Sequence, residues 1–254
     1  MRTLMVAVLL SSLCCPYSLL AADPEPTAVP PSLDALLAQA NEWYDQRENP
    51  EAVPKAIDLY QQVLAQDPNN YQALWRLSRC CWWQGDHSPR NQQMALYDLG
   101  QQTGERARAA APQEVDGHYW YGACVGRAAE VRGVLNSLFA IDPIRKAMET
   151  VLSLDPKHAH ALYVLGVLYR KAPGWPLSCG DINKSLEYAR QAADLAPNEV
   201  LTQMGLAETL LAKGDKAEAK RILEMALTLE GPADLRPETK TDKKTVQELL
   251  KKNF

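Results

Sequence analysis

The chain is 254 residues long, which is enough for one sizeable domain or two small ones. Hydrophobic residues make up 46% of it and charged residues 23%, as in ordinary globular proteins. The formal net charge is −4, which makes nucleic acid a poor partner, because binding to phosphates needs a surplus of lysine and arginine.

The first residues of the chain have the pattern of an export signal. Arg2 is followed by an apolar run and then by small residues that end at Ala22. A proline inside the run argues against a membrane anchor, and no later segment is long and apolar enough to span a bilayer. We therefore predict a signal peptide over residues 1–22 that is cleaved near Ala22, and a periplasmic location. Lipoprotein processing at Cys14 or Cys15 is the alternative, although the residues before them are not the small ones it favours.

A proline-rich linker follows at residues 23–31, with the sequence DPEPTAVPP. Four prolines in nine residues favour an extended spacer between the export signal and the folded part. After residue 31 the apolar residues recur with helical spacing, and strand-like alternation is scarce. The sequence therefore predicts an all-helical body.

Prolines mark the boundaries of an internal repeat. Pro68, Pro112, Pro156 and Pro197 each follow one apolar helical run and precede another, and they lie 44, 44 and 41 residues apart. Gly231 occupies the equivalent place 34 residues further on. Proline ends the preceding helix and pre-sets the backbone for the next one, so this spacing predicts stacked helical units.

Small and large apolar residues within these units resemble the tetratricopeptide (TPR) consensus, a helix–turn–helix of 34 residues. Small side chains let two helices approach closely, and large ones fill the space between units. We therefore predict an all-α, TPR-like solenoid of four to five helix–turn–helix units over residues 32–236, closed by a capping helix at 237–254. The last unit matches best, through Leu206, Ala207, Leu210 or Leu211, Gly214, Asp215, Ala219, Leu223 and Ala226.

Three of the units are longer than the consensus. The extra residues, 87–94, 130–143 and 172–181, are predicted to be insertions between the two helices of their unit, on one edge of the stack. The third contains Trp175 and Leu177, which are apolar for a loop. These two side chains anchor the loop by burial, cover a ligand as a lid, or do both; anchoring is the favoured interpretation.

Four stretches narrow the resemblance further: residues 118–122, 132–139, 143–149 and 173–181. Together they are similar to the T-component of TRAP (tripartite ATP-independent periplasmic) transporters, over roughly residues 35–230. The resemblance implies a periplasmic TPR protein, often a lipoprotein, with an apolar pore or cavity. It also implies the solute-binding subunit of a TRAP system as protein partner, and it leaves a homo-oligomer open.

One stripe of side chains on the first helix of each unit should face the concave groove of such a solenoid. The sequence places large aromatic residues and three arginines on this stripe. Aromatic rings bury apolar surface and arginine pairs with carboxylates, so an elongated organic-acid or amphiphilic ligand would fit. In the opposing interpretation, the aromatics pack under the insertions and the arginines are solvated or paired with glutamate. The candidate ligand-binding residues are Trp75, Arg79, Trp82, Tyr119, Arg127, Tyr163, Arg170 and Trp175.

Signatures of metal sites, cofactors and catalysis are missing from the sequence. No C-x-x-C pair occurs, and His158 and His160 are two residues apart, so they do not share a helical face. Neither a nucleophile elbow, a phosphate-binding loop nor an H-E-x-x-H motif is found, so we predict a non-enzymatic protein without a cofactor. Free thiols are expected at Cys80, Cys81, Cys124 and Cys179.

The predicted function is that of a periplasmic accessory and binding protein of a TRAP-type uptake system. The alternative is a general TPR scaffold for protein–protein interaction in the cell envelope, with no small-molecule ligand. A secreted eukaryotic protein is a third option, because Asn183 opens a formal glycosylation triplet.

Overall fold

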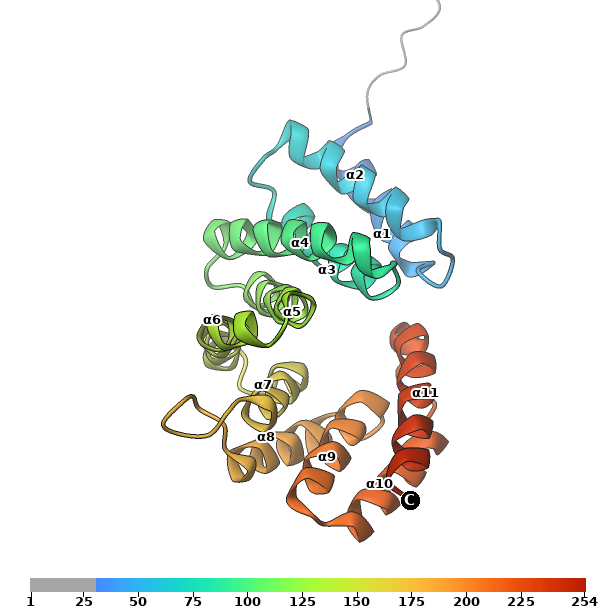
Figure 1. Cartoon of the computed structure of the whole chain (residues 1–254). Coiled ribbons are helices and arrows are strands. Elements are labelled where there is room, and N and C mark those ends of the chain that lie inside the picture. The colour runs from blue at the N-terminus through green and yellow to red at the C-terminus, as the bar shows by residue number, and fades with distance from the viewer. Residues whose placement is uncertain (1–30) are drawn as a thin grey trace, which may run out of the picture. The chain divides into compact units, whose positions relative to one another are not determined.

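Helices account for all the regular secondary structure in residues 31–254, which are the residues that this computed structural model describes, apart from the side chains of residues 134–136. The predicted signal peptide, the two candidate lipidation sites and nearly all of the predicted linker lie outside the described residues. The helices are α1 (Leu33–Asp45), α2 (Ala52–Gln66), α3 (Tyr71–Asp86), α4 (Arg90–Ala110), α5 (Val115–Arg132), α6 (Val134–Leu154), α7 (Ala159–Lys171), α8 (Ile182–Leu195), α9 (Val200–Lys213), α10 (Lys216–Thr228), the 3-10 helix η1 (Ala233–Leu235) and α11 (Arg236–Asn253) (Figure 1).

The helices stack in chain order as five pairs, from α1/α2 to α9/α10. Each helix packs against the next, and the first helices of neighbouring pairs also touch, as α3 does with α5 and α7 with α9. This is the arrangement of a solenoid, in which no pair can bury its apolar face alone. The prediction of an all-α, TPR-like solenoid is confirmed for the described part of the chain.

Side-chain caps show why several helices begin where they do. The side chain of Asn70 accepts a hydrogen bond from Ala73 N at 3.0 Å, and that of Asp215 accepts one from Glu218 N at 3.2 Å. Each bond satisfies one backbone N–H that has no partner within its helix. At the other end of α9, Gly214 has φ +96°, a left-handed conformation that glycine adopts without strain and that ends the helix.

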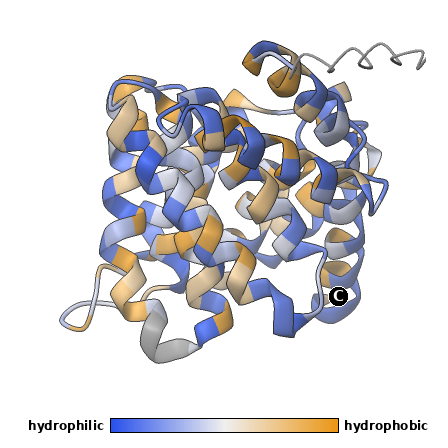
Figure 2. Cartoon of the chain, turned by 90° about the horizontal axis from the view of Figure 1, so that it is seen from above, coloured by the Kyte–Doolittle hydropathy of each residue, from blue (hydrophilic) through white to orange (hydrophobic). Residues whose placement is uncertain are grey.

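Small residues line the contacts between helices, as the TPR pattern predicts. In the last pair Ala207, Ala219 and Ala226 are fully buried, and Leu210 and Leu223 fill the space beside them. Hydrophobic and hydrophilic residues alternate along each helix, so that the apolar ones can turn toward neighbouring helices (Figure 2). The core is therefore a series of interfaces between successive pairs.

Two of the three predicted insertions are not loops. Residues 90–94 belong to α4 and residues 134–143 belong to α6, so the extra length extends these helices to 21 residues each. The first two insertions contain few breakers: Gly133, with φ +94°, separates α5 from α6, and Pro143 is accommodated inside α6. Only the third, with two prolines and two glycines, remains a loop between α7 and α8, because these residues prevent a long helix.

The predicted capping segment, residues 237–254, forms most of α11. Val246 is fully buried, and Leu249 and Leu250 pack partly buried against the core of α8, α9 and α10. The second half of α11 therefore covers the apolar end of the solenoid. Among the described residues, the longer helices are too polar for any of them to cross a bilayer.

Candidate functional site

Aromatic side chains form a continuous stripe across the first helices of the middle pairs. Trp82 on α3 meets Trp120 on α5 edge to face, with ring centroids 5.8 Å apart, and Trp120 meets Tyr119 at 5.0 Å. Tyr119 in turn lies 5.1 Å from the ring of His158 at the start of α7. Edge-to-face contacts of this kind stabilise ring pairs beyond their buried area. We call Trp75, Trp82, Tyr119, Trp120 and Tyr163 the aromatic stripe.

All five residues of the aromatic stripe are half-buried, so each keeps part of its surface accessible. Trp75 donates a hydrogen bond from Nε1 to Gln72 Oε1 at 3.2 Å. Tyr163 lies against α9 where a glycine makes room, since a Cβ on Gly205 would lie 2.7 Å from its ring. Burial raises the pKa of the Tyr119 and Tyr163 phenols above the ordinary range, so both are neutral donors at physiological pH.

Two of the three predicted arginines are occupied by carboxylates of the chain itself. Arg127 donates from Nε to Asp86 Oδ1 at 2.7 Å and also pairs with Glu130. Arg170 pairs with Glu208 at 2.7 Å. In the structure these two guanidinium groups link neighbouring helices, which is what the opposing interpretation expects.

Arg79 is placed differently from the other two arginines. Its guanidinium lies 3.8 Å from the ring centroid of Tyr44 and 5.0 Å from that of Trp75, and its buried Nε has no hydrogen-bond partner among the described residues. Cation–π contacts stabilise such a stacked arginine. Arg79 therefore extends the aromatic stripe toward α1 and leaves one donor unused.

Sequence reasoning missed a group of carboxylates that the structure brings beside the stripe. We call Glu199, Glu238 and Asp242 the inner carboxylates. Glu199 Oε2 is 2.6 Å from His160 Nε2. Burial, and then the charges of Glu238 and Glu199, raise the pKa of Asp242 to about 7, while His160 opposes this shift. The His160 ring in turn lies 6.2 Å from that of Tyr119, so Glu199 reaches the aromatic stripe through His160.

Spacing in the sequence does contain a signal for Asp242. It lies four residues before Val246, and residues four apart share one face of a helix. A carboxylate one turn from a buried valine could therefore have been singled out. Glu199 could not have been placed beside Asp242 from the sequence, because it comes from a different repeat.

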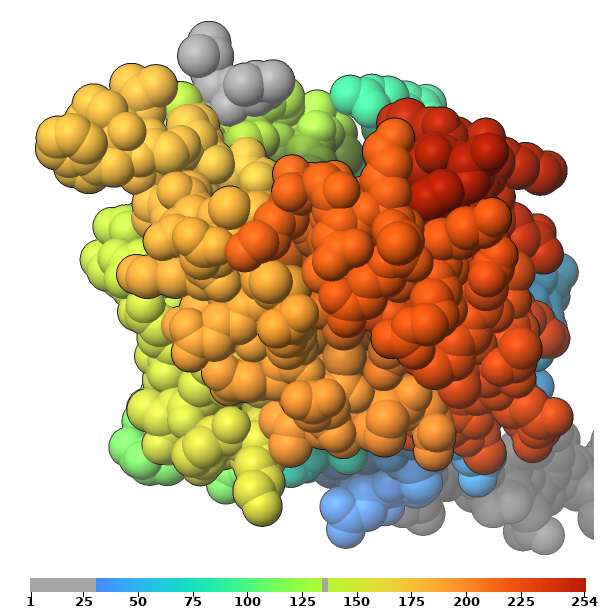
Figure 3. All heavy atoms as spheres, turned by 90° about the horizontal axis from the view of Figure 1, so that it is seen from below, coloured from blue at the N-terminus to red at the C-terminus, as the bar shows by residue number. Residues whose placement is uncertain are grey.

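Trp175 does not lie with the other predicted site residues. Trp175 is 89% exposed and Leu177 is 82% exposed, in the loop between α7 and α8. That loop projects from the body of the molecule (Figure 3). The loop closes instead through its backbone: Asp181 N donates to Tyr169 O at 2.9 Å and Gly180 N to Pro173 O at 2.8 Å. The favoured prediction, that these two side chains anchor the loop by burial, is therefore wrong.

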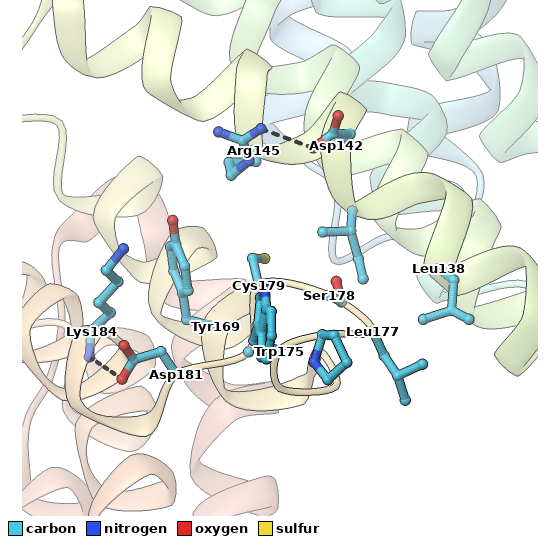
Figure 4. A pocket seen from close by; sticks show the side chains of 13 residues that line it. Leu138, Asp142, Arg145, Tyr169, Trp175, Leu177, Ser178, Cys179, Asp181 and Lys184 are labelled. Atoms are coloured by element: carbon cyan, nitrogen blue, oxygen red, sulfur yellow. Dashed lines mark hydrogen bonds and ion pairs between the residues drawn. The ribbon is translucent and has the colours of Figure 1, made fainter.

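The loop and the first half of α6 line an open surface cavity of about 700 Å³. Trp175, Leu177 and Leu138 line its apolar side, with Arg145 and Tyr169 across from them (Figure 4). Arg145 pairs with acidic residues of α6 on both sides of it. No other residue predicted for the ligand site lines this cavity, so the structure separates two surfaces that the sequence interpretation had joined.

Three of the cysteines and His118 are buried in the packing of the helices. Cys80, Cys81 and Cys124 are buried free thiols, and burial raises the pKa of each. His118 is also buried and its Nε2 lies 3.0 Å from Pro112 O. Within the described part of the chain, no group of histidine, cysteine and carboxylate side chains is arranged to hold a metal ion.

Solved structures similar to this chain are TPR proteins. A thermophilic TPR protein of Thermus thermophilus, TTC0263, superposes with a TM-score of 0.62 at 16% identity, covering 85% of this chain and all of that one. MamA of Desulfovibrio magneticus RS-1 does so with a TM-score of 0.50 at 18% identity, covering 76% of this chain and 95% of that one. At such identities the likeness concerns the fold alone, and it confirms the TPR prediction.

Sequence comparison identifies a family. Regulator of microtubule dynamics protein 2 of Mus musculus is 31% identical over 94 residues, which are 37% of this chain and 23% of the mouse protein. The matched stretch thus spans about a quarter of that relative. The model of the family "Regulator of microtubule dynamics protein 1-3" matches residues 36–172, from α1 through α7. This match covers more than half of the chain, so the chain belongs to the family of regulator of microtubule dynamics proteins 1-3.

Proposed function

We propose that the aromatic stripe and the inner carboxylates bind an extended segment of a partner protein that carries a lysine or an arginine. The TPR-like fold supports a scaffold for protein–protein interaction. The observation that carries the finer proposal is the contact of Glu199 with His160, 2.6 Å apart, beside Tyr119 of the stripe, whose ring lies 6.2 Å from that of His160. Half-buried rings and carboxylates on facing helices suit the apolar stem and the cationic head of such a side chain.

The arginines favour this ligand chemistry over an organic acid. Arg127 and Arg170 are each paired with carboxylates of the chain, so neither offers a free guanidinium to an anion. Arg79 keeps one unpartnered Nε, but its guanidinium lies flat against two aromatic rings. The charges that face the partner are therefore those of Asp242 and Glu199, since Glu238 is bound to Arg47.

Selection of peptides provides the probe for a test. We expect a random peptide library displayed on phage and selected on the full chain to yield peptides enriched in lysine or arginine. Calorimetry then measures their affinity for the parent and for Trp75→Ala, which should bind about tenfold more weakly, because a contacting aromatic side chain contributes about 1–2 kcal/mol.

Trp175→Ala is the matched control, because it removes the same side chain from the exposed loop. It should leave the affinity unchanged. The reverse result, with Trp175→Ala weakening the binding and Trp75→Ala leaving it intact, would move the site to the cavity beside α6 and contradict the proposal.

The exposure of Trp175 also leads to a prediction about stability. Trp175→Ala should change the free energy of unfolding by no more than about 0.5 kcal/mol, because an exposed side chain away from caps and ion pairs contributes little. Urea denaturation followed by circular dichroism measures this. A decrease in the free energy of unfolding well above 1 kcal/mol would restore the anchoring interpretation. Trp83→Ala, which removes a buried indole, is the positive control.

Regulation of microtubules is a second candidate function, and the family match over α1 to α7 favours it. The chain would then use its first three helix pairs to act on microtubules, as the name of its mouse relative describes. Co-pelleting of the full chain with polymerised tubulin tests this, together with the rate of tubulin assembly. If the chain stays in the supernatant and the assembly rate is unaltered, this function does not hold.

The accessory role in a TRAP system stays a prediction from the sequence. It would give the solute-binding subunit of that system as the partner and the periplasm as the location. Co-purification of the chain with such a subunit from an envelope fraction is the direct test. Recovery of other partners only would favour the general scaffold.

A further inference from the structure

The first and last parts of the described chain are joined by one buried ion pair. Arg47, in the turn between α1 and α2, donates from Nε to Glu238 Oε1 at 2.9 Å and from its terminal nitrogen to Glu238 Oε2 at 2.8 Å. It also donates to the backbone oxygen of Asp234. The two paired residues lie 191 positions apart in the sequence. A bidentate pair of this kind fixes both distance and orientation.

Arg47 is built into its surroundings. Its side chain is only 6% exposed, and its guanidinium lies 5.0 Å from the ring centroid of Tyr44 and 5.4 Å from that of Trp83. Beside it, Lys240 of α11 pairs with Glu48. We call these two ion pairs, Arg47–Glu238 and Lys240–Glu48, the clasp.

Apolar contacts hold α11 at its other end. Val246, Leu249 and Leu250, in its second half, pack against the core of α8 to α10. Thr239, in the first half, is buried against Gly231 of the preceding turn. The backbone of α11 packs against α9 and α10, while the first repeat is reached through side chains. In Figure 1 the C-terminus, where α11 ends, lies beside α10 at the end of the stack, and the opposite end of α11 points toward α1.

We infer that the clasp is a reversible closure that controls access to the aromatic stripe. While it is closed, the solenoid is joined into a ring, and a partner enters only by threading one end of its chain. When it opens, α11 moves away from α1 and α2 while its apolar half stays in place, and a segment inside a longer chain can enter from the side. The control of access to the aromatic stripe rests on the function proposed above, whereas the closure of the ring does not.

The contacts explain why the closure is reversible. Opening separates the two ion pairs and the hydrogen bond from Arg47 to Asp234 O, and water then replaces the partners of the charged groups. The apolar contacts of α11 lie in its second half and are kept. The stacking of Arg47 on Tyr44 of α1 and Trp83 of α3 does not involve α11, so it is kept when the pair breaks and the side chain stays in place to pair again.

The distance between the two ends can be measured in the full chain. Spin labels on Glu51→Cys and Lys244→Cys report it; both residues are exposed, and neither belongs to the clasp. Cys14, Cys15 and Cys179 are replaced by serine, which leaves three buried cysteines. We expect one dominant short distance in this parent, and an additional longer population in Arg47→Met, which keeps an unbranched side chain between the rings.

Controls separate opening from damage to the fold. Arg145→Met removes an arginine that pairs with Asp142 and Glu149 within α6, and it should leave the distance distribution unchanged. Glu238→Gln keeps the shape of the partner and should also lengthen the distance, which covers the case that Arg47→Met does not fold. If both clasp variants fold and keep the distribution of the parent, the clasp does not hold the ends together.

Access is measured with the peptides selected above. The ligand is a selected peptide that carries a folded domain at each end, so that it cannot enter by threading. A bis-maleimide link between Glu48→Cys and Lys240→Cys should slow the association of this ligand. Arg47→Met should speed its association severalfold. If the distances change but the association rates do not, the clasp does not control access to the aromatic stripe. This result would not affect the proposed binding site. If no peptide binds along the aromatic stripe at all, the proposed function fails, and the label distances still decide the closure.

Discussion

Replacement of Gly104 by alanine is expected to lower the free energy of unfolding by about 1–3 kcal/mol. Gly104 lies in α4 where the backbone of α5 comes closest: a Cβ there would be 2.8 Å from Tyr121 Cα and 2.9 Å from Tyr121 N. Real Cβ atoms do not approach backbone atoms so closely, so the two helices must separate. Urea denaturation at constant pH gives the change directly.

Gly126→Ala is the matched control, on the neighbouring helix α5. The nearest atom to a Cβ there is the Cδ1 of Ile144 at 3.6 Å, an ordinary contact. Alanine should therefore stabilise the protein by about 0.5–1 kcal/mol through helix propensity alone. If Gly104→Ala proves as stabilising as Gly126→Ala, the close packing of α4 on α5 is incorrect.

Asp242→Asn is expected to stabilise the protein by about 2–3 kcal/mol at pH 8. The Asp242 carboxyl has its pKa raised from 3.8 to about 7, through burial and the neighbouring carboxylates. An ionised Asp242 is therefore unfavourable in the folded state, and the amide removes this penalty. The magnitude is set below the full shift because the side chain is partly exposed to water.

The pH dependence follows from the sign of this shift. Below about pH 4 the carboxyl is protonated in both folded and unfolded chains, so it contributes nothing to stability. Between about 4 and 7 the unfolded chain loses the proton first, so the stability of the parent falls as pH rises. Above about 7 the penalty is complete and constant. The difference between Asp242→Asn and the parent should therefore be small at pH 4.5 and full at pH 8.

Asp194→Asn serves as the control for this measurement, since Asp194 is an exposed carboxyl on α8. It makes the same change from Asp to Asn at the surface, so its effect on the free energy of unfolding should be small. An Asp242→Asn variant whose stability follows the parent at both pH values would mean that Asp242 is fully hydrated in the folded protein.

Much of the architecture could be predicted from local patterns in the sequence. The prolines at repeat boundaries end one helix and prepare the next, and Ala207, Ala219 and Ala226 mark where helices touch. The secondary structure of the insertions was harder to predict. Residues 87–94 and 130–143 exceed the consensus length, but length alone does not distinguish a loop from a longer helix, and the structure extends α4 and α6 through them.

The candidate site could be predicted only in part. The aromatic stripe follows from helical spacing within each repeat, so Trp75, Trp82, Tyr119 and Tyr163 were identified from sequence. The partners of the arginines depend on the distance between neighbouring helices, which spacing does not determine. Arg127 could have faced a ligand, yet Asp86 and Glu130 lie within reach of it.

By itself, the sequence determined that this chain folds as stacked helix pairs with aromatic side chains on the first helix of each pair, because propensity, breakers and periodicity act over a few residues. The tertiary structure alone decided that Glu238 meets Arg47 and that Glu199 meets His160. These contacts join residues far apart in the chain, and they depend on the curvature that accumulates over all five helix pairs. A small rotation at each interface changes where α11 arrives, so no local pattern records the clasp or the inner carboxylates.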